Sequence, residues 1–579
     1  MSRRVAFLLS VASIAAALPM ALSGLPAAAA DPFTVETLHF QVLVGPDDNQ
    51  PCDIVGDLYT PTGLTRPAPA ILTTNGFGGS KDGQAPLARL AASNGYVVLS
   101  YSGLGFGGST CKITLDDPDY DGKAGKQLID YLASLPFVAK EKGNDPKVGM
   151  VGGSYGGAIQ FAVASVDPRL DTIIPMITWN DLSYSIGPNN TDQLSPGAVS
   201  SGTPGAIKLL WGAGFSARGV LDGAQQAQDD PARMLPCPNF ADFVCPALVT
   251  AGTTGFFQPD AVAALRHASV ASYVDKVRIP TLLMQGQNDT LFNLNESVAT
   301  YHALKAQGTP VKMVWHSWGH SGGPQPGEID LGAPDPATQY QTGRILAWFD
   351  HYLKGRNNVG TGPAFAYFRD WVDYTGNAAP AFGTSSSFPV GTAKTYTFSG
   401  TGQLTQGVPA VGSQTFTTVA AGAPTSINPF DVLGGYAPLP AVPATDLPGT
   451  FAAWTTPALT SKVDVVGSPV ATFRVSAPTV TLSQLAGPAG QLVLFVKVQD
   501  VAPDGTASLI YNLEAPIRVP DATKPIKVTL PAIVHRFEQR HQIRLVVAGG
   551  STNYRSGVTA TPVTIASGLG QTLSLPVVP

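Results

Sequence analysis

The stretch from Lys147 to Ser165, KVGMVGGSYGGAIQFAVAS, is the part of the chain that most constrains its fold. An apolar run ends in two glycine pairs around Ser154 and Tyr155, and an apolar segment of helical composition follows. This order is typical of a nucleophile elbow, a tight strand-to-helix turn that strains the serine backbone. Gly152 and Gly156 lie two residues before and two residues after Ser154, at the positions that must lack a Cβ. The alternative is a glycine-rich turn with an idle serine.

The rest of the first half repeats the same alternation. Over residues 31–185, short apolar runs such as APAILTTN and VVLSYSG alternate with amphipathic segments such as KQLIDYLASLP. This pattern predicts a parallel sheet covered by helices on both faces, an α/β core. The elbow at the end of one of its strands is the motif of the α/β-hydrolase fold. Residues 186–274 break the pattern and predict an inserted, mostly helical cap. The alternation returns over residues 275–358, with RIPTLLMQG and VKMVWHSWGH.

From residue 361 to residue 579 the character of the sequence changes. Segments rich in Val, Thr, Ile and Phe, such as QLVLFVKVQDV, are separated by turn residues with little helical pattern. They predict an all-β sandwich.

Residues 1–30 predict a removed export signal. Arg3 and Arg4 precede an apolar segment that ends in Ala28-Ala29-Ala30, although SRRVAF matches a twin-arginine signal only in part. A membrane anchor is the alternative, but the apolar segment is short and rich in alanine. Removal of two arginines and no acid changes the formal charge from -5 to -7, which disfavours nucleic acid as a partner. We therefore expect a secreted protein that is not bound to a membrane after the signal is removed.

The four cysteines fit an oxidising compartment. Cys237 and Cys245 are close enough to close one local loop, which would leave Cys52 and Cys111 for a longer one, although the sequence allows three pairings. No cysteine has the spacing of a zinc ligand, so we expect no metal.

A nucleophilic serine needs a base and an acid, which follow it in this fold in the order Ser, Asp, His. Asp289 follows the run IPTLLMQG, where a parallel sheet places its chemistry, although a helix-capping aspartate is the alternative. Two histidines compete for the base. His320 is preferred because it falls on the loop after VKMVWHSWG, whereas His316 belongs to the strand end.

The oxyanion formed during acyl transfer needs two amide donors. One is the N–H of Tyr155, the residue after the nucleophile. The other is assigned to Phe77, in the loop NGFGGSKD, where glycines let the backbone approach the substrate. A plain turn is the alternative for this loop.

Together these motifs resemble a known family. GGSYGG, the QGQND loop, the WGH loop and a tail that contains VQDVAPDGTASLI and HRFEQRHQIRLVVAGGS are similar to the X-Pro dipeptidyl-peptidase and cocaine-esterase group of serine hydrolases. The resemblance covers most of residues 55–579. It implies a Ser-Asp-His hydrolase without a cofactor, acting on a peptide or small-molecule substrate, whose jelly roll helps to wall the active site.

The sequence also departs from that family. Asn75-Gly76-Phe77 replaces the tyrosine that assists the oxyanion hole in esterase relatives, so a two-amide hole fits better. A dipeptidyl peptidase needs a carboxylate for the substrate amine, yet residues 186–280 contain no glutamate and only aspartates, including Asp192, Asp222, Asp229 and Asp230. We expect a serine hydrolase that cleaves an amide or ester bond, an X-Pro dipeptidyl-peptidase-like peptidase or acyl hydrolase, with a carboxylesterase without peptidase activity as the alternative. An inactive polymer-binding protein, which would use sandwich aromatics such as Phe473 and Tyr511, is the alternative of another class.

Overall fold

The computed structural model describes residues 31–193, 199, 203–228, 230–333, 335–419, 425–427, 445–555 and 557–579. The predicted signal, residues 1–30, lies outside them. In this part of the chain no helix is both long enough and apolar enough to cross a membrane.

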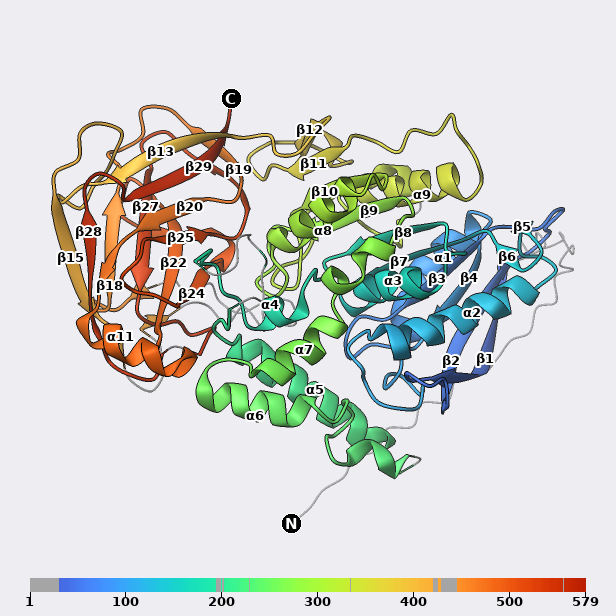
Figure 1. Ribbon diagram of the computed structural model, residues 1–579. Coiled ribbons are helices and arrows are strands. Elements are labelled where there is room, and N and C mark those ends of the chain that lie inside the picture. Colours follow the sequence, from blue (N-terminus) through green and yellow to red (C-terminus); the bar gives the residue numbers. More distant parts are fainter. Residues whose placement is uncertain are drawn as a thin grey trace, which may run out of the picture.

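A ten-stranded sheet forms the first domain (Figure 1). Its central strands are parallel, and antiparallel strands close both edges. In spatial order the strands are β1 (Phe33–Val44), β2 (Gln50–Pro61), β4 (Val97–Tyr101), β3 (Ala70–Thr74), β7 (Val148–Gly153), β8 (Thr172–Met176), β9 (Thr281–Gly286), β10 (Val311–His316), β11 (Phe365–Phe368) and β12 (Phe382–Ser385).

Helices cover both faces of this sheet because its central strands alternate apolar side chains between two cores. One core joins the sheet to α2 (Lys123–Ser134), α3 (Tyr155–Val166) and α8 (Leu294–Ala306). The other joins it to α1 (Ala85–Ser93) and α9 (Tyr340–Tyr352). Ile173 and Ile174, neighbours on β8, belong to different cores. The predicted α/β-hydrolase core is confirmed.

The cap is inserted between β8 and β9 and consists mainly of α4 (Leu182–Ile186), α5 (Leu209–Gln226), α6 (Val244–Thr254) and α7 (Pro259–His267). In Figure 1 α4 lies between the sheet and the C-terminal domain, and α5, α6 and α7 lie below this junction. Their aromatic and aliphatic side chains form a core of their own together with Tyr155 and Phe292 of the hydrolase domain. The cap therefore packs directly against the loops at the carboxyl ends of the strands.

The C-terminal domain is a β-sandwich with antiparallel ladders and a separate apolar core, as predicted. One sheet contains β14 (Leu404–Thr405), β13 (Thr392–Phe398), β29 (Thr572–Val578), β19 (Val463–Gly467), β26 (Ile533–Phe537), β20 (Val470–Phe473) and β25 (Ile526–Thr529). Another contains β18 (Phe451–Thr455), β27 (Gln542–Ala548), β22 (Leu492–Val501), β23 (Ala507–Leu509) and β24 (Ala515–Val519). A smaller one contains β15 (Gly412–Thr417), β28 (Pro562–Ser567) and β21 (Val475–Ser476).

The junction between the two domains lies later in the chain than the sequence suggests. The sequence analysis ended the hydrolase core at residue 358, but β11 and β12 extend its sheet to Ser385. FAYF and FGTS are β-rich segments, so composition alone groups them with the sandwich that follows. Their pairing partner, β10, shows that they belong to the first sheet.

Both predicted disulfides form. Cys52 pairs with Cys111 and Cys237 pairs with Cys245, at Cα–Cα distances of 5.7 and 5.5 Å. The first bridge joins β2 to the loop after β4, and the second closes the start of α6. Of the three pairings that the sequence allows, the structure therefore selects this one.

Candidate active site

Ser154 lies on the sharp turn between β7 and α3. Its φ of 59° and ψ of -121° are rare for a residue with a side chain. A Cβ on Gly152 would lie 2.6 Å from the carbonyl oxygen of Gly156, and a Cβ on Gly156 would lie 2.5 Å from that of Thr74. Both distances are too short for a real side chain, so the turn requires glycine on either side of the serine.

His320 joins Ser154 to Asp289. Its Nε2 lies 2.8 Å from Ser154 Oγ, and its Nδ1 lies 2.7 Å from Asp289 Oδ2. Asp289 is fully buried on the loop after β9, and its Oδ1 accepts hydrogen bonds from the N–H groups of Leu291 (3.0 Å) and Phe292 (2.7 Å). With Nδ1–H donating to the carboxylate, Nε2 is free to accept the serine proton. The structure thus brings together three residues that the sequence predicts from separate loops.

Aromatic rings hold the imidazole of His320 in place. The ring of Phe292 lies perpendicular to it at a centroid distance of 5.2 Å, and that of Trp211, from α5, lies at 6.1 Å. His316 is at the end of β10, fully buried, and stacks on Trp318 at 4.1 Å. Burial lowers the pKa of His316 to about 3, so it stays neutral. The arrangement favours His320 over His316 as the base.

The two amides assigned to the oxyanion site flank the serine. Tyr155 is the first residue of α3, so its N–H lies outside the helical i-to-i-4 hydrogen bonds and belongs to the positive end of the helix. On the other side, a Cβ on Gly76 would lie 3.7 Å from Ser154 Cβ. The Gly79 N–H donates to the Gly76 carbonyl at 3.0 Å and turns the chain around Phe77. The Phe77 turn therefore lies beside the serine.

Two buried carboxyl groups behind Tyr155 were missed by the sequence analysis. The Tyr155 hydroxyl accepts a hydrogen bond from the Asp116 N–H at 3.0 Å and donates to Asp121 Oδ2 at 3.4 Å. Burial raises the pKa of Asp121 to about 7. The acidic run DDPDYDG offered a signal, but only the fold shows that it lies under the elbow. These contacts orient the residue that follows the nucleophile.

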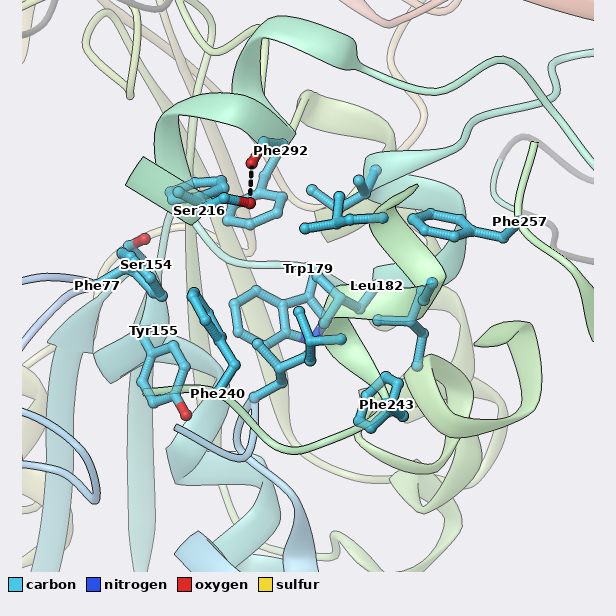
Figure 2. Close-up of a pocket in the computed structure, with 18 residues that line it drawn as sticks. Phe77, Ser154, Tyr155, Trp179, Leu182, Ser216, Phe240, Phe243, Phe257 and Phe292 are labelled. Atoms are coloured by element: carbon cyan, nitrogen blue, oxygen red, sulfur yellow. Dashed lines mark hydrogen bonds between the residues drawn. The ribbon is translucent and has the colours of Figure 1, made fainter. Parts of the chain in front are cut away.

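An apolar pocket opens at Ser154, with about 770 Å³ of empty space, part of it open to solvent. In Figure 2 the rings of Phe77, Tyr155, Trp179 and Phe240 gather beside the serine, with Leu182 and Phe243 farther along. Of the lining residues, all within the described part of the chain, none carries a charge. Ser216 is the one other hydroxyl besides those of Ser154 and Tyr155, and it donates to the Gly212 carbonyl at 2.8 Å. The pocket is therefore built for an uncharged, apolar group.

The aspartates considered for binding a substrate amine lie elsewhere. Asp192 pairs with Lys527, Asp222 with Arg218, and Asp230 with Arg233. None of these three aspartates lines the pocket. Asp229 lies outside the described residues. The structure thus brings no cap carboxylate into the pocket within its described part.

One group of side chains in the described residues has the spacing of a metal site. Ligand atoms of Asp117, Asp119 and His267 lie within 4.8 Å of one another. His267 Nε2 lies 3.2 Å from an Asp119 oxygen and 3.4 Å from an Asp117 oxygen, so the three form ion pairs when the histidine is protonated. None of them lines the Ser154 pocket. They give no reason to involve a metal in chemistry at Ser154.

Comparisons with known proteins match both domains. Residues 51–322 match the family model described as X-Pro dipeptidyl-peptidase (S15 family). Residues 368–564 match the model described as X-Pro dipeptidyl-peptidase C-terminal non-catalytic domain. Together the two models cover most of the hydrolase core, the whole cap and most of the sandwich.

Two curated proteins are similar over part of their length. A putative Xaa-Pro dipeptidyl-peptidase of Rhodopirellula baltica is 26% identical over 279 residues, or 46% of this chain and 38% of that protein. A bis(hydroxyethyl) terephthalate hydrolase of Streptomyces coelicolor is 29% identical over 126 residues, or 22% of this chain and 38% of that protein. The matched region thus spans well under half of each relative.

Solved structures share the fold over nearly the whole chain. An aminopeptidase from a Thaumarchaeota archaeon superposes with a TM-score of 0.65 at 15% identity, over 97% of this chain and 98% of that one. An α-amino acid ester hydrolase gives 0.62 at 16% identity, over 96% and 99%. A CocE/NonD family hydrolase of Staphylococcus aureus gives 0.61 at 14% identity, over 94% and 97%. These structures show the shared fold, and the two family models, which together match most of the chain, show that it belongs to the X-Pro dipeptidyl-peptidase family.

Proposed function

We propose that this protein is a secreted serine hydrolase that cleaves an ester or amide bond through an acyl-serine intermediate. The observation that carries the proposal is the continuous hydrogen-bonded chain from Ser154 Oγ through His320 to Asp289, at 2.8 and 2.7 Å. This is the arrangement that activates a serine hydroxyl, because the histidine takes its proton and the carboxylate stabilises the resulting imidazolium.

In the first half-reaction, His320 Nε2 takes the Ser154 proton while Oγ attacks the substrate carbonyl carbon. The N–H groups of Phe77 and Tyr155 stabilise the tetrahedral oxyanion, and such a donor contributes about 10²–10³ in rate. The imidazolium then gives its proton to the leaving alcohol or amine. In the second half-reaction His320 takes a proton from a water molecule while the water oxygen attacks the acyl carbon. The bond between the acyl carbon and Ser154 Oγ then breaks, the proton passes from His320 to Ser154 Oγ, and the carboxylic acid leaves.

The pocket favours esters with an uncharged, apolar acyl group, which is the carboxylesterase alternative. Burying a substrate ammonium among Phe240, Phe243 and Leu182 without a carboxylate would be costly. The terephthalate hydrolase among the relatives carries the name of an uncharged aromatic ester, which agrees with this choice. An X-Pro dipeptidyl peptidase remains the second candidate, because both family models carry that description.

The test of the chemistry is Ser154→Ala. We expect turnover of a nitrophenyl ester to fall by about 10⁴–10⁶ while the thermal midpoint stays within a few degrees of the wild type. Normal turnover in this variant would remove Ser154 from the mechanism. His320→Ala, assayed for labelling by a fluorophosphonate, tests the base in the same way.

The test of the substrate class is a panel of p-nitrophenyl butyrate, p-nitrophenyl benzoate and Ala-Pro-p-nitroanilide. We expect ester cleavage with little or no release of nitroaniline. Efficient cleavage of the dipeptide anilide would instead establish the peptidase and require a carboxylate from outside the described lining of the pocket.

Export is proposed from the predicted signal and is supported by the two disulfides, which persist in oxidising compartments. Amino-terminal sequencing of protein from the culture medium should begin near Asp31. A mature protein that still contains Arg3 and Arg4 would contradict the removal of the signal.

A further inference from the structure

Lys208 is a buried lysine in the cap, and it directly precedes α5. Its side chain is 2% exposed, and its Nζ donates to the Leu291 carbonyl at 2.5 Å. Its backbone N–H donates to the Ile186 carbonyl at 2.8 Å, which fixes the start of the helix. An ammonium group removed from water is costly unless partners compensate for the lost hydration. We therefore expect partners near the candidate active site to compensate for the burial of Lys208.

The Leu291 carbonyl, which accepts the hydrogen bond from Lys208, belongs to the turn that carries Asp289. The N–H groups of Leu291 and Phe292 donate to Asp289 Oδ1, and the Leu291 carbonyl on the same turn accepts from Lys208. Three residues later, on the same face of α5, Trp211 Nε1 donates to Thr290 Oγ1 at 3.2 Å. The start of α5 thus makes two hydrogen bonds to the turn that carries Asp289.

Lys208 also carries a charge into this region. The acidic groups around it are Asp289, Glu296 of α8 and Glu514 of the sandwich, which lines the same small cavity. Burial lowers the pKa of Lys208 to about 8, and the carboxylates of Glu296 and Asp289 oppose that effect. At neutral pH and below, Lys208 is therefore mainly protonated.

Glu296 is itself a buried partner and is fixed independently of Lys208. Its Oε2 accepts from the Asn180 N–H at 2.8 Å, and its Oε1 accepts from Ser185 Oγ at 2.5 Å. Burial raises the pKa of Glu296 to about 7, with the nearby Asp181 adding to the shift. Below that pH Glu296 loses most of its negative charge and no longer compensates for the charge of the Lys208 ammonium.

We propose that Lys208 is a positioning residue for the reaction at Ser154: its ammonium holds the Asp289 turn in place and sets a fixed positive charge near the Asp289–His320 pair. This inference rests on the proposed function. A positive charge close to a histidine opposes formation of the imidazolium, so removal of the charge at residue 208 should be visible in the pH dependence of the reaction.

The experiment measures how fast a fluorophosphonate labels Ser154 in the full-length protein, as a function of pH, and needs no knowledge of the substrate. Lys208→Gln keeps a hydrogen-bond donor for the Leu291 carbonyl and removes the charge, whereas Lys208→Met removes both. We expect the apparent pKa of the acid limb to rise by about half a unit to one unit in both variants. We also expect the Met variant to lower the plateau rate more than the Gln variant, by about tenfold, because its turn loses a bond.

The matched control is Lys497→Met. Lys497 is equally buried, but it lies in β22 of the sandwich, where Nζ bonds Asp446 at 2.6 Å and Ser426 at 2.7 Å. This variant should lower the thermal midpoint and leave the acid limb where it is in the wild type. A shift in the Lys208 variants alone separates the local charge from a general loss of stability.

The possible results separate a failure of the role of Lys208 from a failure of the proposed function. If the Lys208 variants fold, are labelled and keep the wild-type acid limb, the role of Lys208 is refuted and the proposed function stands. If the wild-type protein is not labelled at Ser154, the proposed function fails and this inference fails with it. If the Met variant does not fold, the Gln variant alone decides.

Discussion

Ser154 has a positive φ on a tight turn, and this turn leaves no room for side chains at residues 152 and 156. The carbonyls of Gly156 and Thr74 occupy the space where the Cβ atoms of residues 152 and 156 would lie. A conformation of this kind can be predicted from the sequence, since steric contacts among residues close in the chain decide it. The role of each glycine can therefore be tested by adding one methyl group.

Gly156→Ala should disrupt the elbow. Its Cβ would approach the Thr74 carbonyl oxygen to 2.5 Å, so the turn must shift and Ser154 Oγ must move relative to His320. We expect kcat/KM to fall at least about 10²-fold, since misplacement by about 1 Å has that effect. The control is Gly252→Ala in α6, where an added Cβ meets nothing within 4 Å. That variant should keep full activity and gain slightly in stability, because alanine favours a helix over glycine by about 1 kcal/mol.

His316 affects stability rather than catalysis. Burial lowers its pKa to about 3, whereas histidine in the unfolded chain is protonated below about 6.5. Unfolding therefore takes up a proton between these values, and the stability contributed by neutral His316 is lost as the pH falls from about 6.5 towards 3. His316→Phe keeps a ring to stack on Trp318 and removes this proton uptake. The thermal midpoint of the variant should fall less steeply with decreasing pH than that of the wild type, and an equally steep fall would contradict the assignment.

Among the elements, the loops after β3, β7, β9 and β10 carry the site, and the cap helices cover it. The sequence predicts the strands and the loops because apolar runs of strand length alternate with helical segments. It does not predict how the cap closes over them. Phe240 and Phe257 look like scattered aromatics in the sequence, yet the first stacks on Phe77 at 5.8 Å and both line the pocket.

The two disulfides should differ in their contribution to stability. Cys52 and Cys111 are 59 residues apart, and Cys237 and Cys245 are 8 apart. Loop entropy assigns about 4 kcal/mol to the longer loop and about 2.5 kcal/mol to the shorter one. The double variant Cys52→Ala/Cys111→Ala should therefore lower the thermal midpoint more than Cys237→Ala/Cys245→Ala. The reverse order would show that the short loop gains its stability from the cap packing around it.

At the scale of the whole molecule, the sandwich holds the cap. Arg518 of β24 is buried, and its guanidinium donates to the carbonyls of Gly205 at 3.2 Å and Gly255 at 3.1 Å, both in the cap. It also lies 4.9 Å from the centroid of the Phe256 ring. Tyr511 makes a second link, because its hydroxyl lies 3.1 Å from Gln287 Oε1, next to the acid loop. The C-terminal domain therefore contributes to the site without supplying its chemistry.

These contacts also bear on the alternative of a polymer-binding sandwich. Phe473 is in the sandwich core, and Tyr511 is turned towards the hydrolase domain. Neither ring lies on an exposed face of the sandwich.

Arg518→Met should loosen the cap. It leaves two cap carbonyls without their donor, and a buried unsatisfied group costs about 1–3 kcal/mol. We expect faster hydrogen–deuterium exchange in α5–α7 than in the wild type, with no change in α2. The control is Arg536→Met, which removes a partner of Asp464 within the same sandwich and should leave the cap unchanged. Unaltered exchange in the cap of the Arg518 variant would show that other contacts hold it.

The sequence by itself determined the strand-elbow-helix unit at Ser154, the loops that carry Asp289 and His320, and the change to an all-β domain. Each of these depends on short-range sterics or on local periodicity. Only the tertiary structure decided that β11 and β12 join the first sheet, that Asp116 and Asp121 lie behind Tyr155, and that Lys208 reaches the Asp289 turn. Such contacts link segments tens to hundreds of residues apart, and they form only where packing and the burial of charge are satisfied together.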